Sequence, residues 1–219
     1  MKKYWAEFFG TYILVFVGCG AIIINSITDG TVSHLGIGLS FGLVVMTMIY
    51  TIGDISGAHI NPAVTIAFAV AKRLEKKQVL PYVGSQIIGA ILASATLYLI
   101  FPDADTMGET LPLNDNLIQS FILEVILTFI LMFVILNVST GAKEKGITAA
   151  LAIGSVVAFS AIFAGPISGA SMNPARSIAP ALFSDLPHLW IYIVATTLGA
   201  ILSVFACKLI QKKECCTDC

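Results

Sequence analysis

One short pattern occurs twice in this 219-residue chain, as SGAHINPA at residues 56–63 and as SGASMNPA at residues 168–175. Each copy contains an Asn-Pro pair, beginning at Asn61 and at Asn173, that precedes a run of mostly apolar residues. Asn is a preferred N-cap of helices, and Pro is a preferred first helical residue. The apolar run 62–71 allows a helix of roughly 15 Å at about 1.5 Å per residue. Each copy therefore predicts a short helix that follows an extended segment.

The composition indicates that these short helices lie in a membrane. The chain is 57% hydrophobic and only 11% charged, whereas a soluble domain carries roughly 25% charged residues. This excludes a disordered protein, a disulfide scaffold and an ordinary soluble globule. Six windows contain no Asp, Glu, Lys or Arg apart from Glu124, namely 8–27, 35–53, 78–102, 116–142, 146–175 and 186–207. They predict six transmembrane helices, the first of them a retained helix rather than a secretion signal.

The basic residues predict the orientation of these six spans. Eleven of the twelve fall on one side of the predicted topology: Lys2, Lys3, Lys72, Arg73, Lys76, Lys77, Lys143, Lys145, Lys208, Lys212 and Lys213. Since cytoplasmic loops are enriched in Lys and Arg, we expect both termini in the cytoplasm. Arg176 is the exception and needs a separate explanation.

The two halves of the chain repeat one another. The pattern Glu-x3-Thr-x2-Leu begins at Glu7 and again at Glu124, and Gly-Ala-Ile-Leu begins at Gly89 and again at Gly199. We assign repeat one to residues 1–102 and repeat two to 116–211 of a single domain, 1–219, with a Cys-rich tail at 212–219. Because each half holds three spans, the second copy is predicted to be inverted. Inverted repeats place their shared site near the bilayer midplane.

The paired short helices predict a pore at that midplane. Extended backbone at membrane depth is tolerated where it is buried in protein or lines a water-filled cavity. The amides of Asn61 and Asn173 would donate hydrogen bonds to a passing oxygen, and the positive helix N-termini would repel cations. Backbone carbonyls would form acceptor ladders on either side, from Gly57, Ala58, His59, Ile60, Gly169, Ala170, Ser171 and Met172. The pattern predicts passage of neutral molecules and exclusion of protons and ions.

Arg176 fits this pore as a constriction residue. It lies three residues after Asn173, in the first turn of the second short helix. A charged side chain in a bilayer is costly, so we expect this one to face an aqueous path and to be held by backbone. Arg residues of this kind form electrostatic barriers in aquaporin-type pores.

These segments resemble the signature loops of the aquaporin, or major intrinsic protein, family. The resemblance rests on two Asn-Pro-Ala segments followed by Arg176, and it covers essentially the whole chain. The segments are Asn61, Pro62, Ala63 and Asn173, Pro174, Ala175. It implies an all-α membrane protein of six transmembrane helices plus two re-entrant half-helices, with one pore per chain and a homotetramer. By spacing, the family's selectivity filter maps onto Phe41, Ala161, Ala170 and Arg176. The family's buried carboxylates, which hold loop backbone near the pore, map onto Glu7 and Glu124.

The substrate signals conflict. Ser177, Ala181 and Tyr192 resemble water channels, whereas residues 163–172 resemble the plant nodulin-like branch, whose members pass glycerol and metalloid acids. Ala161 replaces the His of water-selective members and should widen the filter. We expect a channel for water and small uncharged solutes, with glycerol, urea and metalloid acids as candidates. The alternative is a strictly water-selective aquaporin. A secondary transporter is a weaker alternative, because coupling needs ionisable groups at the midplane and Glu7 and Glu124 stand at the beginnings of spans.

Other function classes lack support in the sequence. The chain shows no nucleophile triad, no phosphate-cradling glycine loop and no metal-ligand cluster, so we expect no enzyme, no cofactor and no metal. The tail cysteines lack the second ligand cluster of a metal site. The basic residues are scattered over short loops, which does not favour nucleic-acid binding. The expected partners are membrane lipid and further copies of the chain, in the cell membrane (plasma or inner).

Overall fold

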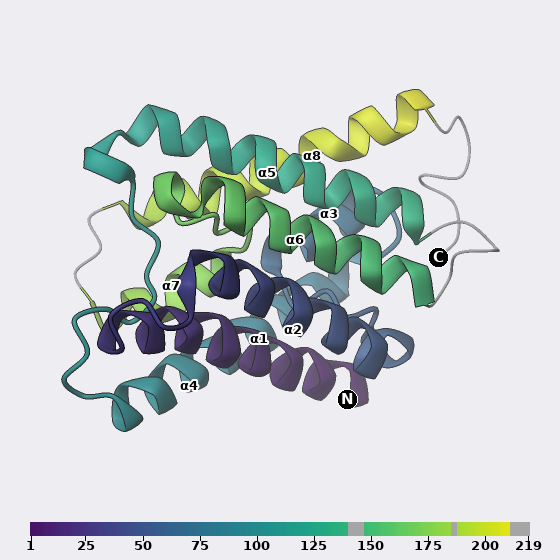
Figure 1. Ribbon diagram of the computed structural model, residues 1–219. Coiled ribbons are helices and arrows are strands. Elements are labelled where there is room, and N and C mark those ends of the chain that lie inside the picture. Colours follow the sequence, from purple (N-terminus) through teal and green to yellow (C-terminus); the bar gives the residue numbers. More distant parts are fainter. Residues whose placement is uncertain (140–146, 185–187, 211–219) are drawn as a thin grey trace.

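The computed structural model describes residues 1–139, 147–184 and 188–210, and these fold into a bundle of helices (Figure 1). Within them there is no strand. The elements are α1 (Lys2–Ile27), α2 (Ser33–Ser56), α3 (Pro62–Val70), α4 (Lys76–Ile100), η1 (Leu113–Asp115), α5 (Leu117–Val138), α6 (Ile147–Ser168), α7 (Pro174–Ala181) and α8 (Leu189–Ile210). Six of these helices are long and apolar enough to span a membrane, which confirms the predicted fold class. The predicted features at Lys143, Lys145, Lys212, Lys213 and the tail 212–219 lie outside the described residues.

The helices follow the predicted repeat. In the first half α1 packs on α4, and in the second half α5 packs on α8. The matching glycines lie at these two contacts: a Cβ on Gly89 would overlap the Phe8 carbonyl oxygen, and one on Gly199 would overlap the Val125 carbonyl oxygen. Two helix backbones can approach this closely only where a side chain is absent. The sequence repeat of Gly-Ala-Ile-Leu thus marks equivalent helix crossings in the two halves.

The two halves meet along α2 and α6 and interlock through the short helices. Helix α3 packs more extensively against α8, in the other half, than against α4, and α7 packs more extensively against α4 than against α8. Both short helices begin as predicted. The Asn61 side chain accepts a hydrogen bond from the Ala63 amide at 2.9 Å, and the Asn173 side chain accepts one from the Ala175 amide at 3.0 Å. With nine and eight residues, each extends about halfway across a bilayer.

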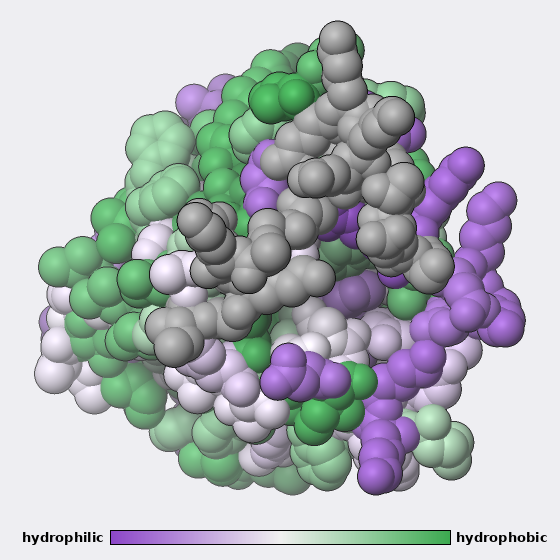
Figure 2. All heavy atoms as spheres, turned by 90° about the vertical axis from the view of Figure 1, so that its right-hand side faces the viewer, coloured by the Kyte–Doolittle hydropathy of each residue, from purple (hydrophilic) through white to green (hydrophobic). Residues whose placement is uncertain are grey.

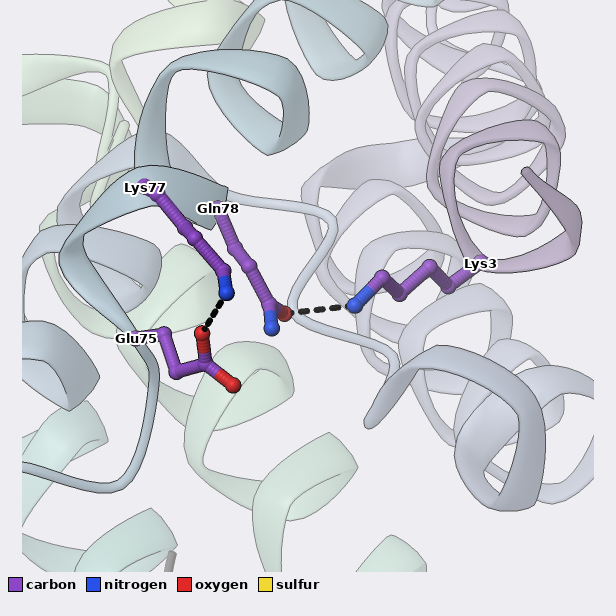
Figure 3. Close-up of polar contacts among 4 residues, drawn as sticks. All are labelled: Lys3, Glu75, Lys77 and Gln78. Atoms are coloured by element: carbon purple, nitrogen blue, oxygen red, sulfur yellow. Dashed lines mark hydrogen bonds and ion pairs between the residues drawn. The ribbon is translucent and has the colours of Figure 1, made fainter.

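One end of the bundle gathers the helix ends that carry most of the basic residues. In Figure 1, α1 begins and α3 and α8 end at the right-hand side, and Figure 2 shows hydrophilic side chains on this end. Two contacts there are drawn in Figure 3. Lys3 donates a hydrogen bond to Gln78 at 2.6 Å, and Lys77 forms an ion pair with Glu75 at 2.7 Å. The hydrogen bond and charge of Lys77 lower the pKa of Glu75.

The helix crossing at Gly199 yields a stability prediction. Gly199→Ala should lower the free energy of unfolding by about 1–3 kcal/mol, because the added methyl overpacks the α5–α8 contact. Gly84→Ala is the matched control, since a Cβ at Gly84 meets no atom within 4 Å and alanine favours a helix by about 0.5–1 kcal/mol. Denaturant unfolding in detergent measures both. Equal effects of the two substitutions would contradict the proposed close approach.

Candidate functional site

The two Asn-Pro-Ala segments meet in the interior and exchange hydrogen bonds. The Asn61 Nδ2 atom donates to the Met172 carbonyl at 2.7 Å, and the Asn173 Nδ2 atom donates to the Ile60 carbonyl at 2.9 Å. A side-chain amide carries two N–H donors, so each Asn retains one for a guest. From the sequence alone, these two carbonyls were expected to accept hydrogen bonds from a guest. The structure adds that each already accepts one hydrogen bond from the opposite half.

Two buried carboxylates hold the extended segments that lead to this meeting point. Glu7 Oε1 accepts hydrogen bonds from the His59 amide at 2.9 Å and from Ser56 Oγ at 2.7 Å, and Glu7 Oε2 accepts one from the Ile60 amide at 2.7 Å. Both Glu7 and Glu124 have an exposed fraction of 0%. A buried carboxylate is costly unless it is hydrogen-bonded, and here the donors are two backbone amides outside the helices and one serine hydroxyl.

Glu124 repeats this arrangement in the second half. Its Oε1 atom accepts from the Ser171 amide and from Ser168 Oγ, both at 2.8 Å, and its Oε2 atom accepts from the Met172 amide at 2.9 Å. Ser168 and Ser171 stand at the same places in the second segment as Ser56 and His59 in the first. The inverted repeat is therefore visible in the hydrogen bonds as well as in the sequence, since equivalent carboxylate oxygens accept from equivalent residues.

The extended segments have an unusual backbone that these contacts stabilise. Four non-glycine residues adopt a left-handed φ: Ala58 at 47°, Ile60 at 43°, Ala170 at 42° and Met172 at 52°. Such conformations are rare outside glycine and cost roughly 1–3 kcal/mol each, so they persist only where the surroundings hold them. The amides of Ile60 and Met172 are among those bound by Glu7 and Glu124. The carboxylates thus keep the segments in a shape that the free chain would not adopt.

A cavity of about 520 Å³ runs along both segments. Its lining includes all four predicted filter residues, both Asn residues and every predicted carbonyl position except Gly169. Gly169 instead packs against Thr110, which a Cβ at this position would contact at 2.9 Å. Tyr50 and Asp54, near the end of α2, also line the cavity. The structure therefore brings the predicted site residues of both halves together around one passage.

Arg176 lies at this passage and is held by backbone. Its exposed fraction is 2%, its Nη1 atom donates to the Gly108 carbonyl at 2.5 Å, and its guanidinium carbon lies 5.1 Å from the centre of the Phe41 ring. The ring face attracts the cation. Gly108 belongs to the α4–α5 loop, which the sequence analysis did not connect with the site. An inward-turning loop has no periodic hydrophobic pattern, so the sequence offered only an apolar residue, Met107, in a mostly polar stretch.

A second group that the sequence analysis missed lies beside His59. Gln86 of α4 donates to Glu7 Oε2 at 2.7 Å and to Thr65 Oγ1 at 2.9 Å. Thr65 Oγ1 is also 3.1 Å from His59 Nδ1, and the His59 ring stacks on Phe68 with centroids 4.6 Å apart. The imidazole that lines the cavity is therefore fixed on one face by an aromatic ring and at one nitrogen by a hydroxyl. The only sequence signal for Gln86 was a polar residue within an apolar span.

The hydrogen bonds of Glu124 yield a second prediction. Glu124→Gln keeps the side-chain size but replaces one accepting oxygen with an NH2 group, which cannot accept from a backbone amide. Leaving a buried amide unpaired should reduce the free energy of unfolding by about 1–3 kcal/mol. Glu75→Gln, at an exposed position, should change it by less than about 0.5 kcal/mol. Denaturant unfolding in detergent compares them, and an undiminished stability of Glu124→Gln would refute the backbone-holding role.

Comparison with known proteins agrees with this geometry. The family model described as major intrinsic protein matches residues 1–207. Aquaporin NIP1-1 of Zea mays is 46% identical over 213 residues, which cover 96% of this chain and 75% of that protein. Nodulin-26 of Glycine max is 43% identical over 213 residues, covering 96% of this chain and 78% of that protein.

A solved structure shows the same architecture. The X-ray structure of the aquaglyceroporin from Plasmodium falciparum superimposes with a TM-score of 0.86 at 26% identity, covering 96% of this chain and 97% of that one. The resemblance inferred from the Asn-Pro-Ala segments, including that to the nodulin-like branch, is thereby confirmed. The chain belongs to the major intrinsic protein family and is an integral membrane protein.

Proposed function

We propose that this protein is a passive channel for water and small uncharged solutes such as glycerol. The observation that carries the proposal is the pair of Asn61 and Asn173, each with one N–H left for a guest, in a cavity lined by both halves of the chain. The relatives named as aquaporins and the similar fold of an aquaglyceroporin support it. Channel function in this family is non-enzymatic.

Charge at the centre of the passage accounts for the exclusion of ions. Helices α3 and α7 both begin where Asn61 and Asn173 meet, and each helix N-terminus presents about half a positive charge. Cations are repelled there. A water molecule that accepts hydrogen bonds from both Asn amides donates outward along the passage and cannot accept a proton from its neighbour. The carbonyls on either side supply the acceptors.

Side-chain size at the filter favours solutes larger than water. The side chains of Ala161 and Ala170 are single methyl groups, and they line the same cavity as the guanidinium of Arg176 and the ring of Phe41. A lining that combines apolar side chains with the N–H donors of Arg176 suits a polyol, which carries both a carbon chain and hydroxyl groups. The strictly water-selective alternative would need a bulky polar group where Ala161 stands. We therefore extend the proposed substrates to urea and to neutral metalloid acids.

A proton-coupled transporter is disfavoured by the surroundings of Glu7 and Glu124, the two acidic side chains that are buried within the described part of the chain. Glu7 and Glu124 have an exposed fraction of 0%, and their oxygens accept at least three hydrogen bonds each from the loops. Neither residue lines the cavity. A coupling group has to exchange protons with the permeation path, which these two buried carboxylates do not reach. Asp54 does line the cavity, but it is exposed near the end of α2.

The cellular setting extends the proposal. The basic residues gathered at one end of the bundle favour a cytoplasmic location of that end and of both termini. The exposed apolar side chains on the transmembrane helices suit contact with lipid and with neighbouring copies. We place the protein as a homotetramer in the cell membrane, as the family resemblance implies.

The filter proposal predicts the effect of one substitution. Ala161→His should reduce glycerol permeability by about tenfold, equivalent to about 1.4 kcal/mol of added barrier, because the imidazole fills the space that the methyl leaves open. The same substitution should change water permeability by less than about threefold. Stopped-flow light scattering of proteoliposomes measures both. Ser155→His, on an exposed part of α6 away from the cavity, is the matched control.

Each alternative has its own outcome in this assay. Fast osmotic shrinkage, with uptake of glycerol, urea and boric acid no faster than in empty liposomes, would establish a strictly water-selective channel. Saturable uptake that follows a pH gradient would establish the transporter. Linear, non-saturating flux of water and glycerol supports the channel.

A further inference from the structure

Helix α6 contains a proline near its end, Pro166. Proline has no backbone N–H, so it cannot donate to the carbonyl four residues earlier in a helix, which here is that of Ile162. Hydrocarbon offers a backbone carbonyl no hydrogen-bond partner. The turn of α6 that carries Ile162 therefore needs a donor from outside its own helix.

His34, in the first turn of α2, supplies this donor. Its Nε2 atom lies 2.7 Å from the Ile162 carbonyl oxygen. Because a carbonyl oxygen can only accept, the imidazole nitrogen carries a proton and donates it to the hydrogen bond. Gly165 leaves room for the ring, since a Cβ there would lie 3.0 Å from His34 Cε1. A proline, a glycine and a histidine thus combine in one contact between α6 and α2.

This contact lies where the two halves of the chain pack together, along α2 and α6 (Figure 1). One turn after His34, a Cβ on Gly38 would overlap the Ile162 side chain and lie 3.2 Å from the Ile162 amide nitrogen. Ala161 directly precedes Ile162, and Phe41 follows Gly38 by one turn of α2. Both Ala161 and Phe41 line the cavity. The distance between these two filter residues therefore depends on how closely this turn of α6 is held against α2.

The first half of the repeat has neither the proline nor the histidine at the equivalent places. Pro166 stands two residues before the second Ser-Gly-Ala, and Asp54 stands two residues before the first. Asp54 has a backbone N–H that can donate to its own helix. His34 stands four residues before the glycine of Ile-Gly in α2, and Ala150 stands at that place in α6. The donor side chain thus accompanies the missing backbone N–H.

We propose that His34, which does not line the cavity, is a positioning residue of the selectivity filter. By donating to the Ile162 carbonyl, it holds the turn that carries Ala161 against α2. The proposal rests on the proposed channel function. Without this hydrogen bond the turn moves away from α2, and the passage between Ala161 and Phe41 widens. His34 thereby limits the size of the solutes that pass, from a position outside the passage.

The test measures the permeability of proteoliposomes to erythritol, a polyol larger than glycerol, relative to their permeability to water. His34→Ala should raise this ratio by about fivefold, the effect of losing about one hydrogen bond. His34→Phe, which keeps a ring but has no donor, should raise it as well. His34→Gln, whose side-chain amide presents an N–H at similar reach, should keep the wild-type ratio. Thr47→Ala is the matched control and should leave the ratio unchanged, because the exposed Thr47 hydroxyl donates to the Leu43 carbonyl of its own helix.

A double-mutant cycle tests whether His34 acts through the Ile162 carbonyl. Pro166→Ala, at an exposed position, provides a backbone N–H that donates to this carbonyl within α6. In that background His34→Ala should no longer change the ratio, because the carbonyl has a helical partner. A persistent rise there would overturn the proposal, as would a wild-type ratio for His34→Ala or a raised ratio for His34→Gln. A wild-type protein that conducts neither water nor glycerol would instead refute the proposed function itself.

Discussion

The whole arrangement depends on two buried carboxylates that satisfy backbone amides where no helix can. Hydrocarbon offers no hydrogen-bond partner, so irregular backbone at membrane depth must be paired internally or lie along water. Glu7 and Glu124 supply that pairing to one loop each, at matching atoms. With the loops held, the short helices α3 and α7 begin at the centre, and their Asn caps exchange hydrogen bonds across the two halves.

The two halves share this design but differ in what supports it. Helix α3 receives a hydrogen bond from Gln86 of the neighbouring α4, whereas α7 receives one from Thr110 of the α4–α5 loop. The half of the site around α3 is therefore supported by a neighbouring helix of the bundle, and the half that contains Arg176 by a loop. Since loops tolerate sequence change better than packed helices do, this asymmetry offers a route by which the filter can change without altering the bundle.

Much of the site followed from the sequence because its determinants are local or periodic. Asn61 and Asn173 cap the helices that directly follow them, and the repeat of Glu7 at Glu124 is visible by alignment of the chain with itself. Gln86 and Gly108 were not predicted as parts of the site. Their roles arise from contacts between segments distant in sequence, Gln86 with Glu7 and Gly108 with Arg176. A single polar residue in a span, or a glycine in a loop, carries no signal of its partner.

The sequence by itself determined the six spans, the inverted repeat, the two capped half-helices and the family, because hydrophobic length, charge position and capping are properties of short segments. Only the tertiary structure decided which hydrogen bonds remain for a guest. Each Asn amide donates one hydrogen bond to the loop of the opposite half, and the Arg176 guanidinium donates one to the Gly108 carbonyl. These hydrogen bonds depend on how the two halves of the chain pack against each other. A local sequence pattern cannot predict them, because the partners are distant in sequence and come together only on folding.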